Sequence, residues 1–225
     1  MLPRLSTLLS ITALATSGCA WYEETYKNPD RECWARKGEL LNTVSCQAFI
    51  QLKCPDPLYP KAAPLENGST AKSIPILIKV PDGPESPRVG NLMAHVNPYP
   101  IHAKKSPWQT LKRDLERILL EQGYSIVAVP DEASYLFKAD ITYLDVRSET
   151  GWVKGVTHAE AKFVVAVSDA EGNPLGNRGF SGKHDKAFTY AYIKDYEVTL
   201  GEAYCQALKQ FSSHLGNSDF EKLQW

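Results

Sequence analysis

The chain has 225 residues, of which 43% are hydrophobic and 23% are charged, and its formal net charge is −1. This composition excludes an intrinsically disordered chain, because enough apolar residues are present to build a core. A near-neutral chain has no bulk electrostatic attraction for nucleic acid, so nucleic acid is not an expected partner. The length allows one domain, or one domain with an extension.

The N-terminal residues 1–18 are predicted to be a signal peptide. Arg4 precedes an apolar stretch at residues 5–15, and the small residues Ser17 and Gly18 lie directly before Cys19. A positive charge, a short apolar stretch and small residues in this order are typical of a secretory signal. The apolar stretch is about half as long as a membrane-spanning helix requires. An ordinary cleaved signal peptide, without lipid attachment, is the alternative.

The run of residues 14–19 resembles the lipobox of bacterial lipoproteins, with Thr16 where that motif usually has leucine. The resemblance implies that the Cys19 thiol receives diacylglycerol, that the chain is cut before Cys19, and that the new amino group is acylated, with palmitate among the acyl chains. Ala20 in place of the usual aspartate retention signal implies sorting to the outer membrane. More than one acyl chain gives stable anchoring. The expected location is the periplasmic side of the outer membrane.

Four further cysteines, Cys33, Cys46, Cys54 and Cys205, predict disulfides in an exported chain, with three possible pairings. They contain no C-x-x-C pair, so we expect no zinc site, no redox motif and no other cofactor. If residues 43–53 are helical, Cys46 and Cys54 lie about 12 Å apart, too far for a bond. We therefore favour Cys33 pairing with Cys46 or Cys54. Cys205 either joins the remaining N-terminal cysteine or stays a buried thiol.

Residues 19–72 are predicted to form a Cys-rich extension between the anchor and the main domain. The region ends in closely spaced prolines and an Asn-Gly-Ser turn, which are typical of a linker. Apolar residues between the cysteines indicate that part of the extension folds. We place the domain at residues 73–216 and a C-terminal tail at residues 217–225.

The first half of the domain is predicted to contain one strand, a long loop and one helix. Residues 74–80 form an apolar, β-branched run that ends at a Pro-Asp-Gly-Pro turn. Residues 81–105 show no clear element. Ser106 is the expected N-cap of a helix, with Pro107 at its first position and Gln109 completing a capping box. Gly123 is expected to end this helix.

The second half of the domain is predicted to contain four strands and a final helix. Apolar residues alternate along the strand at 156–169, which marks one buried face. Thr199 and Glu202 are expected to form a capping box for the last helix, which ends before Gly216. The order β-α-β-β-β-β-α predicts an α+β two-layer sandwich, with two helices on one face of a mainly antiparallel sheet. The predicted ranges are 124–129, 138–148, 156–169 and 175–184 for the strands and 198–214 for the helix.

Several pieces of the chain together match one known family pattern. They are Cys19, the strand ending in Val80, the loop 82–90, the helix end Gln122-Gly123-Tyr124, the strand 139–146 and the alternating strand through Val167. With these pieces in this order, the chain resembles the YajG family of outer-membrane lipoproteins over residues 73–216. The resemblance implies an outer-membrane lipoprotein without assigned catalytic residues. The Cys-rich residues 20–72 depart from the family pattern.

The sequence contains no recognisable catalytic or metal-binding motif. Its histidines have neither the H-E-x-x-H motif nor an i, i+4 spacing. Ser181, His184 and Asp185 lie close in sequence but lack the G-x-S-x-G turn of a serine hydrolase. Asp140 and Asp145 lie five positions apart on one strand, so we expect them on opposite faces, not paired. We therefore predict a protein that is not an enzyme and binds no metal.

The predicted function is that of a membrane-anchored binding or accessory subunit of an envelope assembly or transport complex, with envelope proteins as partners. The loop 81–105 is the candidate contact region, because long loops without secondary structure are often functional. The alternative is a small-ligand or lipid carrier with a cavity between sheet and helices, lined by residues such as Trp108, Leu115, Phe163 and Phe211. The candidate partner-binding residues are Met93, His95, Tyr99, His102, Lys104 and Lys105.

Overall fold

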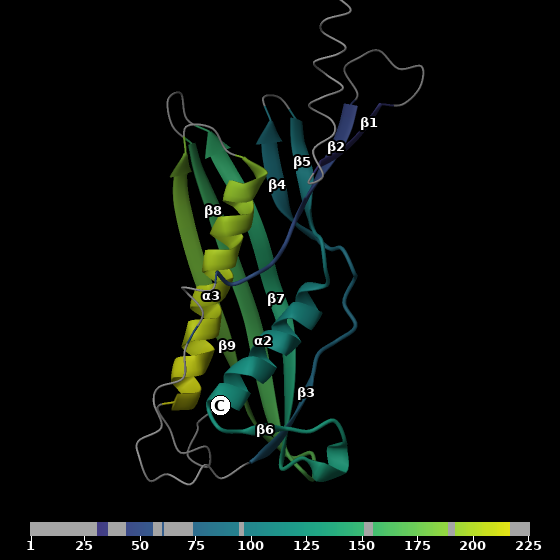
Figure 1. Cartoon of the computed structure of the whole chain (residues 1–225), viewed down its shortest axis with the longest axis vertical. Coiled ribbons are helices and arrows are strands. Elements are labelled where there is room, and N and C mark those ends of the chain that lie inside the picture. The colour runs from purple at the N-terminus through teal and green to yellow at the C-terminus, as the bar shows by residue number, and fades with distance from the viewer. Residues whose placement is uncertain are drawn as a thin grey trace, which may run out of the picture.

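The computed structural model describes residues 31–35, 44–55, 60, 74–94, 97–150, 155–188 and 192–216. Two helices cover one face of a large sheet (Figure 1), which confirms the expected α+β class. The elements are β1 (Arg31–Ala35), β2 (Val44–Ile50), β3 (Pro75–Lys79), β4 (Arg88–Ala94), β5 (Asn97–Ala103), α2 (Pro107–Glu121), β6 (Ser125–Ile126), the 3-10 helix η2 (Pro130–Glu132), β7 (Tyr135–Thr150), β8 (Gly155–Asp169), β9 (Pro174–Phe188) and α3 (Ile193–Gly216).

The described residues form one sheet of nine strands that branches at β7. One edge of β7 pairs with β8 along its whole length, and β8 in turn pairs with β9. The other edge pairs with β3 near its start and with β4 near its end. The ladders β2–β5, β3–β6, β3–β7 and β4–β7 are parallel. The sheet is therefore mixed, and the predicted order β-α-β-β-β-β-α is wrong because it omits β1, β2, β4 and β5.

Residues 88–103 are a β-hairpin, so the prediction of a loop without secondary structure over 81–105 is wrong there. β4 and β5 pair antiparallel from Arg88 to Asn97. Proline is unfavourable in a strand that pairs on both edges, because it has no N–H to donate. Pro98 and Pro100 lie in the part of β5 that pairs with β4 alone, since pairing with β2 begins only at Ile101. The prolines therefore hid a strand that tolerates them.

Helix α2 lies where the sequence predicts it, but its predicted capping box is absent. Ser106 occupies the N-cap position without a side-chain cap hydrogen bond. Instead, the Thr110 hydroxyl donates to the carbonyl oxygen of Ser106 at 3.2 Å. The predicted capping box, in which the side chains of Ser106 and Gln109 would each bond the other's backbone N–H, is therefore wrong. At the other end, the Gly123 φ of 87° matches the expected left-handed stop residue.

Helix α3 begins at Ile193, earlier than the predicted residue 198, so the capping box at Thr199 is wrong as well. The Thr199 hydroxyl lies inside the helix and donates to the carbonyl oxygen of Asp195 at 2.6 Å. The side chain that serves the helix start is that of Asp195. Its Oδ2 accepts a hydrogen bond from the backbone N–H of Tyr192 at 3.0 Å.

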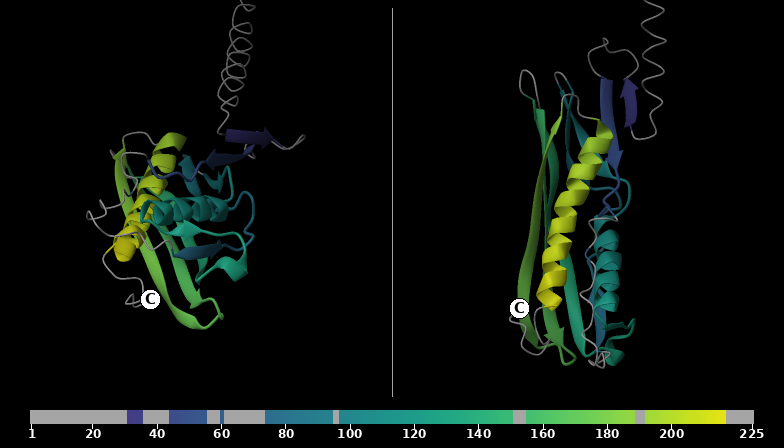
Figure 2. Two further views of the ribbon diagram at one scale, coloured as in Figure 1. Left: turned by 60° about the horizontal axis from the view of Figure 1, so that its bottom comes forward. Right: turned by 60° about the vertical axis from the view of Figure 1, so that its left-hand side comes forward.

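The core lies between the sheet and the two helices. The right-hand view of Figure 2 shows α3 running along the long strands of the sheet. The predicted alternation along β8 is confirmed, because the residues at 159, 161, 163, 165 and 167 are buried. The core also extends into residues N-terminal to the predicted domain start at 73. Part of the expected extension is thus built into the domain, namely Ala48, Ile50, Leu52 and Cys54.

A β-bulge at Thr142 corrects the expected orientation of two aspartates on β7. The register shifts there, so that Asp140 lies opposite Val164 and Asp145 lies opposite Glu160. Both partners occupy alternate positions of β8 on the same face, so the two aspartates also share a face. They remain about 13 Å apart along the strand, which is too far for a catalytic carboxylate pair.

Candidate functional site

The chain segment that follows β2 lies along α3 and forms the strap, which we define as residues 51–55. The backbone N–H of Gln51 donates to Glu197 Oε2 at 2.9 Å. Further along, the carbonyl oxygen of Lys53 lies so close to Gly201 that a Cβ there would be 2.4 Å from it. Glu197 and Gly201 are four residues apart, so they lie on one side of the helix.

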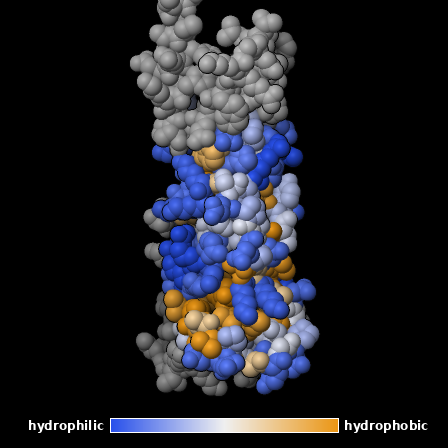
Figure 3. Space-filling model, turned by 90° about the vertical axis from the view of Figure 1, so that its right-hand side faces the viewer, coloured by the Kyte–Doolittle hydropathy of each residue, from blue (hydrophilic) through white to orange (hydrophobic). Residues whose placement is uncertain are grey.

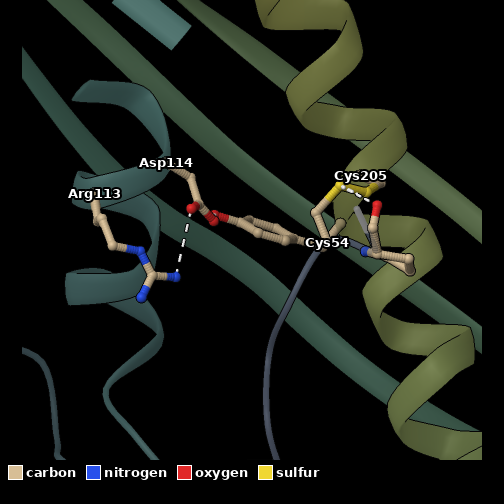
Figure 4. The surroundings of a disulfide bond; sticks show 6 residues. Cys54, Arg113, Asp114 and Cys205 are labelled. Atoms are coloured by element: carbon tan, nitrogen blue, oxygen red, sulfur yellow. Dashed lines mark hydrogen bonds and ion pairs between the residues drawn. A yellow bond between two sulfur atoms is a disulfide. The ribbon is translucent and has the colours of Figure 1, made fainter. Parts of the chain in front are cut away.

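A disulfide between Cys54 and Cys205 completes the strap, and Figure 4 shows it joining the segment to α3. Cys205 is four residues beyond Gly201, so it continues the same side of the helix. The two cysteines are 3% and 1% exposed, and their Cα atoms are 5.0 Å apart. This bond confirms the expectation of a disulfide and decides between the alternatives for Cys205. The buried free thiol is wrong, and so is a Cys33–Cys54 pair.

Gly201→Ala tests how tightly the strap lies on α3. In an exposed helix this substitution stabilises by about 1 kcal/mol, because glycine is a poor helix former. Here the new methyl group would meet the Lys53 carbonyl oxygen, so we expect a loss of about 1–2 kcal/mol. Urea unfolding at 25 °C measures the sign. The exposed helix variant Ser213→Ala is the control, and a stabilised Gly201→Ala would contradict the close contact.

A buried polar contact joins α2 to α3 beside the disulfide. The Tyr204 hydroxyl donates to Asp114 Oδ2 at 3.1 Å, and Asp114 is only 5% exposed. Arg113 lies 3.5 Å from the other carboxylate oxygen (Figure 4). Burial raises the pKa of Asp114, while the neighbouring Arg113 and the Tyr204 hydrogen bond oppose that rise. The contact links the two helices and is not open to a substrate.

Asp114→Asn is expected to change how stability depends on pH. A raised pKa in the folded state favours the protonated carboxyl, so its stabilising contribution is complete below the ordinary value of 3.8. That contribution is lost as pH rises through the raised folded pKa. Asparagine cannot ionise, so the variant should gain stability relative to wild type as pH increases from 4 to 7. Urea unfolding at several pH values measures this, with the exposed Asp131→Asn as control. A constant difference between Asp114→Asn and wild type would contradict it.

A second seam joins α3 to the outer edge of β9. The backbone N–H groups of Ser181 and Lys183 donate to the side-chain oxygens of Gln210 and Gln206, at 3.2 and 3.3 Å. Between them, Gly182 lies against the helix backbone. Unpaired edge strands tend to pair with other chains, and the two glutamines cover this one. Sequence reasoning missed the seam, although two glutamines four residues apart beside an apolar stripe are its signal.

The predicted partner-binding residues do not converge on one site. Met93 lies on β4, and His95 lies outside the described residues. Tyr99 and His102 are both on β5 but at odd spacing, so they lie on opposite faces of the strand. Tyr99 packs against the core. The Nδ1 of His102 lies 3.1 Å from the Ser86 carbonyl oxygen, on the other face.

Lys104 and Lys105 follow β5 directly and are exposed at the start of the connection to α2. They are two adjacent lysines at the end of β5, the second strand of the hairpin. A role for them in partner binding stays a prediction.

Three of the four residues proposed to line a carrier cavity fill the core instead. Phe163 and Phe211 are buried, and both pack against Phe180, with ring centroids 5.3 Å away in each case. Trp108 lies elsewhere, because its indole N–H donates to Asp140 Oδ1 at 2.8 Å. Leu115 is also fully buried. These contacts argue against a ligand cavity at the place where the sequence suggested one.

The described part of the chain brings no catalytic triad together from Ser181, His184 and Asp185. The Nε2 of His184 lies 2.6 Å from a Glu202 carboxylate oxygen on α3. Asp185 instead contacts Nδ1 of His158 at 2.8 Å. Within the same residues no cluster of three or more histidines, cysteines or carboxylates suits a metal ion.

An apolar area lies on the side of the molecule where β3 and β6 are found, in the lower part of Figure 3. Val129, just before η2, is 46% exposed, and Ile126 of β6 is half-buried. Nothing in the described structure indicates what covers this area.

Among the described helices, none is long and apolar enough to cross a membrane.

The described residues define an α+β domain in which two helices cover one face of the sheet and the strap joins β2 to α3. A family model described as "Uncharacterized lipoprotein" matches residues 60–212. The chain therefore belongs to this lipoprotein family. The finer assignment to the YajG family stays a prediction. A search of the curated proteins finds no significant match.

Solved structures resemble the chain at low sequence identity. A protein from Xanthomonas campestris has 10% identity and a TM-score of 0.46, over 74% of this chain and 91% of that one. A minor lipoprotein from Acinetobacter baumannii has 10% identity and a TM-score of 0.38, over 64% and 90%. A lipoprotein from Neisseria meningitidis has 16% identity and a TM-score of 0.28, over 62% and 98%. The family assignment rests on the family model.

Proposed function

We propose that the protein is a lipoprotein anchored through acylated Cys19 on the periplasmic side of the outer membrane, where it acts as a non-enzymatic accessory subunit of an envelope assembly or transport complex. The observation that carries this proposal is the strap. The chain that leads from Cys19 continues into the core of the domain, where α3 holds it by a hydrogen bond, a close backbone contact and a disulfide.

The strap supports a role that depends on position. Arg31, the first residue of β1, is twelve positions beyond Cys19, and a chain of that length can span at most about 40 Å. β1 pairs with β2, β2 pairs with β5, and the strap follows β2. The anchor is therefore connected by a short stretch of chain to the sheet and, through the strap, to α3. This connection keeps the domain within a short distance of the membrane. A subunit that presents a fixed surface to a neighbouring protein needs this arrangement.

We place the partner contact at the corner formed by the β4–β5 hairpin and the exposed Lys104 and Lys105. Two adjacent lysines favour a partner with an acidic surface. The hairpin belongs to the same part of the sheet as β1 and β2, because β5 pairs with β2 (Figure 1). The proposed contact therefore lies on the side of the domain where the anchored segment enters.

Recovery of partners from crosslinked envelopes tests the proposal. Wild type should recover a defined envelope protein, and Cys19→Ser should recover at least ten times less of it. The variant Lys104→Glu/Lys105→Glu should also lose the partner, while the control Lys138→Glu/Lys209→Glu carries the same charge change elsewhere and should keep it. A wild type that recovers nothing specific, or a Cys19→Ser variant that recovers the same partner equally well, would contradict the proposal.

A further inference from the structure

The register of β1 and β2 places two cysteines directly opposite each other. The strands pair antiparallel, and Cys33 is the ladder partner of Cys46. Directly opposite Cα atoms in an antiparallel ladder are about 4.5–5.5 Å apart, whichever kind of pair they form. A disulfide requires a Cα separation of about 4.4–6.8 Å. The backbone alone therefore puts these two positions within the range of a disulfide.

The cysteine inventory leaves these two residues for each other. The chain has five cysteines, and Cys19 is the lipobox residue. Cys54 and Cys205 are already joined. Cys33 and Cys46 are the two cysteines that remain. An exported chain folds and functions in an oxidising compartment, where disulfides form and persist.

We propose that Cys33 and Cys46 form a second disulfide that closes the β1–β2 hairpin. This inference rests on the proposed export of the chain. In its formation the two thiols lose two protons and two electrons, and one sulfur–sulfur bond forms. The disulfide of a thiol–disulfide oxidoreductase in the same compartment accepts the electrons and protons and becomes a dithiol.

The second bond explains how so short an outer strand stays in place. β1 has five residues and pairs with β2 alone in the described sheet. Isolated two-stranded pairing is marginal in water. A covalent link across the ladder keeps β1 on β2, and β2 is held in turn by β5 and by the strap that follows it. The two disulfides thus fix the consecutive stretch 33–54 at both ends, next to the anchor.

Peptide mapping without reduction tests the pairing directly. Trypsin cleavage after lysine and arginine leaves each of the four cysteines on its own peptide, namely 32–36, 38–53, 54–61 and 195–209. The full chain is purified from envelopes after its thiols are blocked with an alkylating agent. We expect peptide 32–36 linked to 38–53, and 54–61 linked to 195–209. Peptide 32–36 linked to any other peptide, or recovered in alkylated form, would overturn the proposal.

Two variants make the result independent of a single spectrum. Cys33→Ser should expose one alkylatable thiol, at Cys46, and leave the Cys54–Cys205 link intact. Cys54→Ala/Cys205→Ala should keep the link between 32–36 and 38–53. A Cys33→Ser protein without an alkylatable Cys46 would overturn the pairing. Alkylation of all four cysteines in wild type would overturn the proposed export too, whereas alkylation at Cys33 and Cys46 alone would overturn this inference and leave the proposed function standing.

Discussion

The variant Gly182→Ala is expected to lose about 3 kcal/mol of unfolding free energy, because it forces α3 away from β9. A Cβ at Gly182 would lie 2.0 Å from the carbonyl oxygen of Ala203 and 2.7 Å from Cβ of Gln206. The first of these contacts is with the helix backbone, so no side-chain rotation relieves it. The seam that Gln206 and Gln210 form with the β9 edge would open with it.

The matched control for this variant lies on the same strand. Gly179 has nothing within 4 Å of an added Cβ, so Gly179→Ala should stay within about 0.5 kcal/mol of wild type. Urea unfolding followed by circular dichroism at 25 °C measures both. Equal effects of the two substitutions would show that close packing at Gly182 does not hold α3 on the sheet.

Removing the disulfide has the second large expected effect. Cys54 and Cys205 are 151 positions apart, so the bond closes a long loop in the unfolded chain. The chain-entropy relation gives about 5 kcal/mol for a loop of this length, and measured losses are typically about 2–4 kcal/mol. We therefore expect Cys54→Ala/Cys205→Ala to lose about 2–5 kcal/mol in urea unfolding, with a steeper dependence on urea as the unfolded chain expands.

Reduction in a Cys33→Ser/Cys46→Ser background separates the covalent link from the packing of the two side chains. In that background reduction breaks only the Cys54–Cys205 bond and keeps both sulfur atoms in the core. The stability of the reduced protein should fall by most of the loss seen in the alanine pair. Reduced and oxidised proteins of equal stability would mean that the strap is held by its other contacts alone, those of Gln51 and Lys53.

The sequence correctly predicted the elements whose signals lie within the element itself or directly beside it. Strand β8 has one buried face and one more exposed face, so apolar and polar residues alternate along it. That alternation predicted both the strand and which of its residues are buried. The bounds of α2 follow from Pro107 and Gly123, which act within one turn. The start of α3 was misplaced because two capping signals lie four residues apart. The side chain of Asp195, not that of Thr199, accepts a hydrogen bond at the N-terminus of the helix.

Long-range pairing was the part that the sequence did not reveal. β2 was considered as a helix, yet it pairs in parallel with β5 about fifty residues later, and no local pattern encodes that contact. In the sequence Gly201 is only a residue of low helix propensity, whereas in the fold the strap backbone lies directly against it. The disulfide alternatives stayed open for the same reason. Cysteine spacing does not report which segments meet, and only the fold brings Cys54 to Cys205.

Mass spectrometry of the mature N-terminus, on protein extracted from the outer-membrane fraction, tests the central claim most directly. The account predicts a chain that begins at Cys19 and carries a diacylglycerol on its thiol and an acyl chain on its amino group. A mature chain that begins at another residue, or at Cys19 without any acyl group, would contradict it.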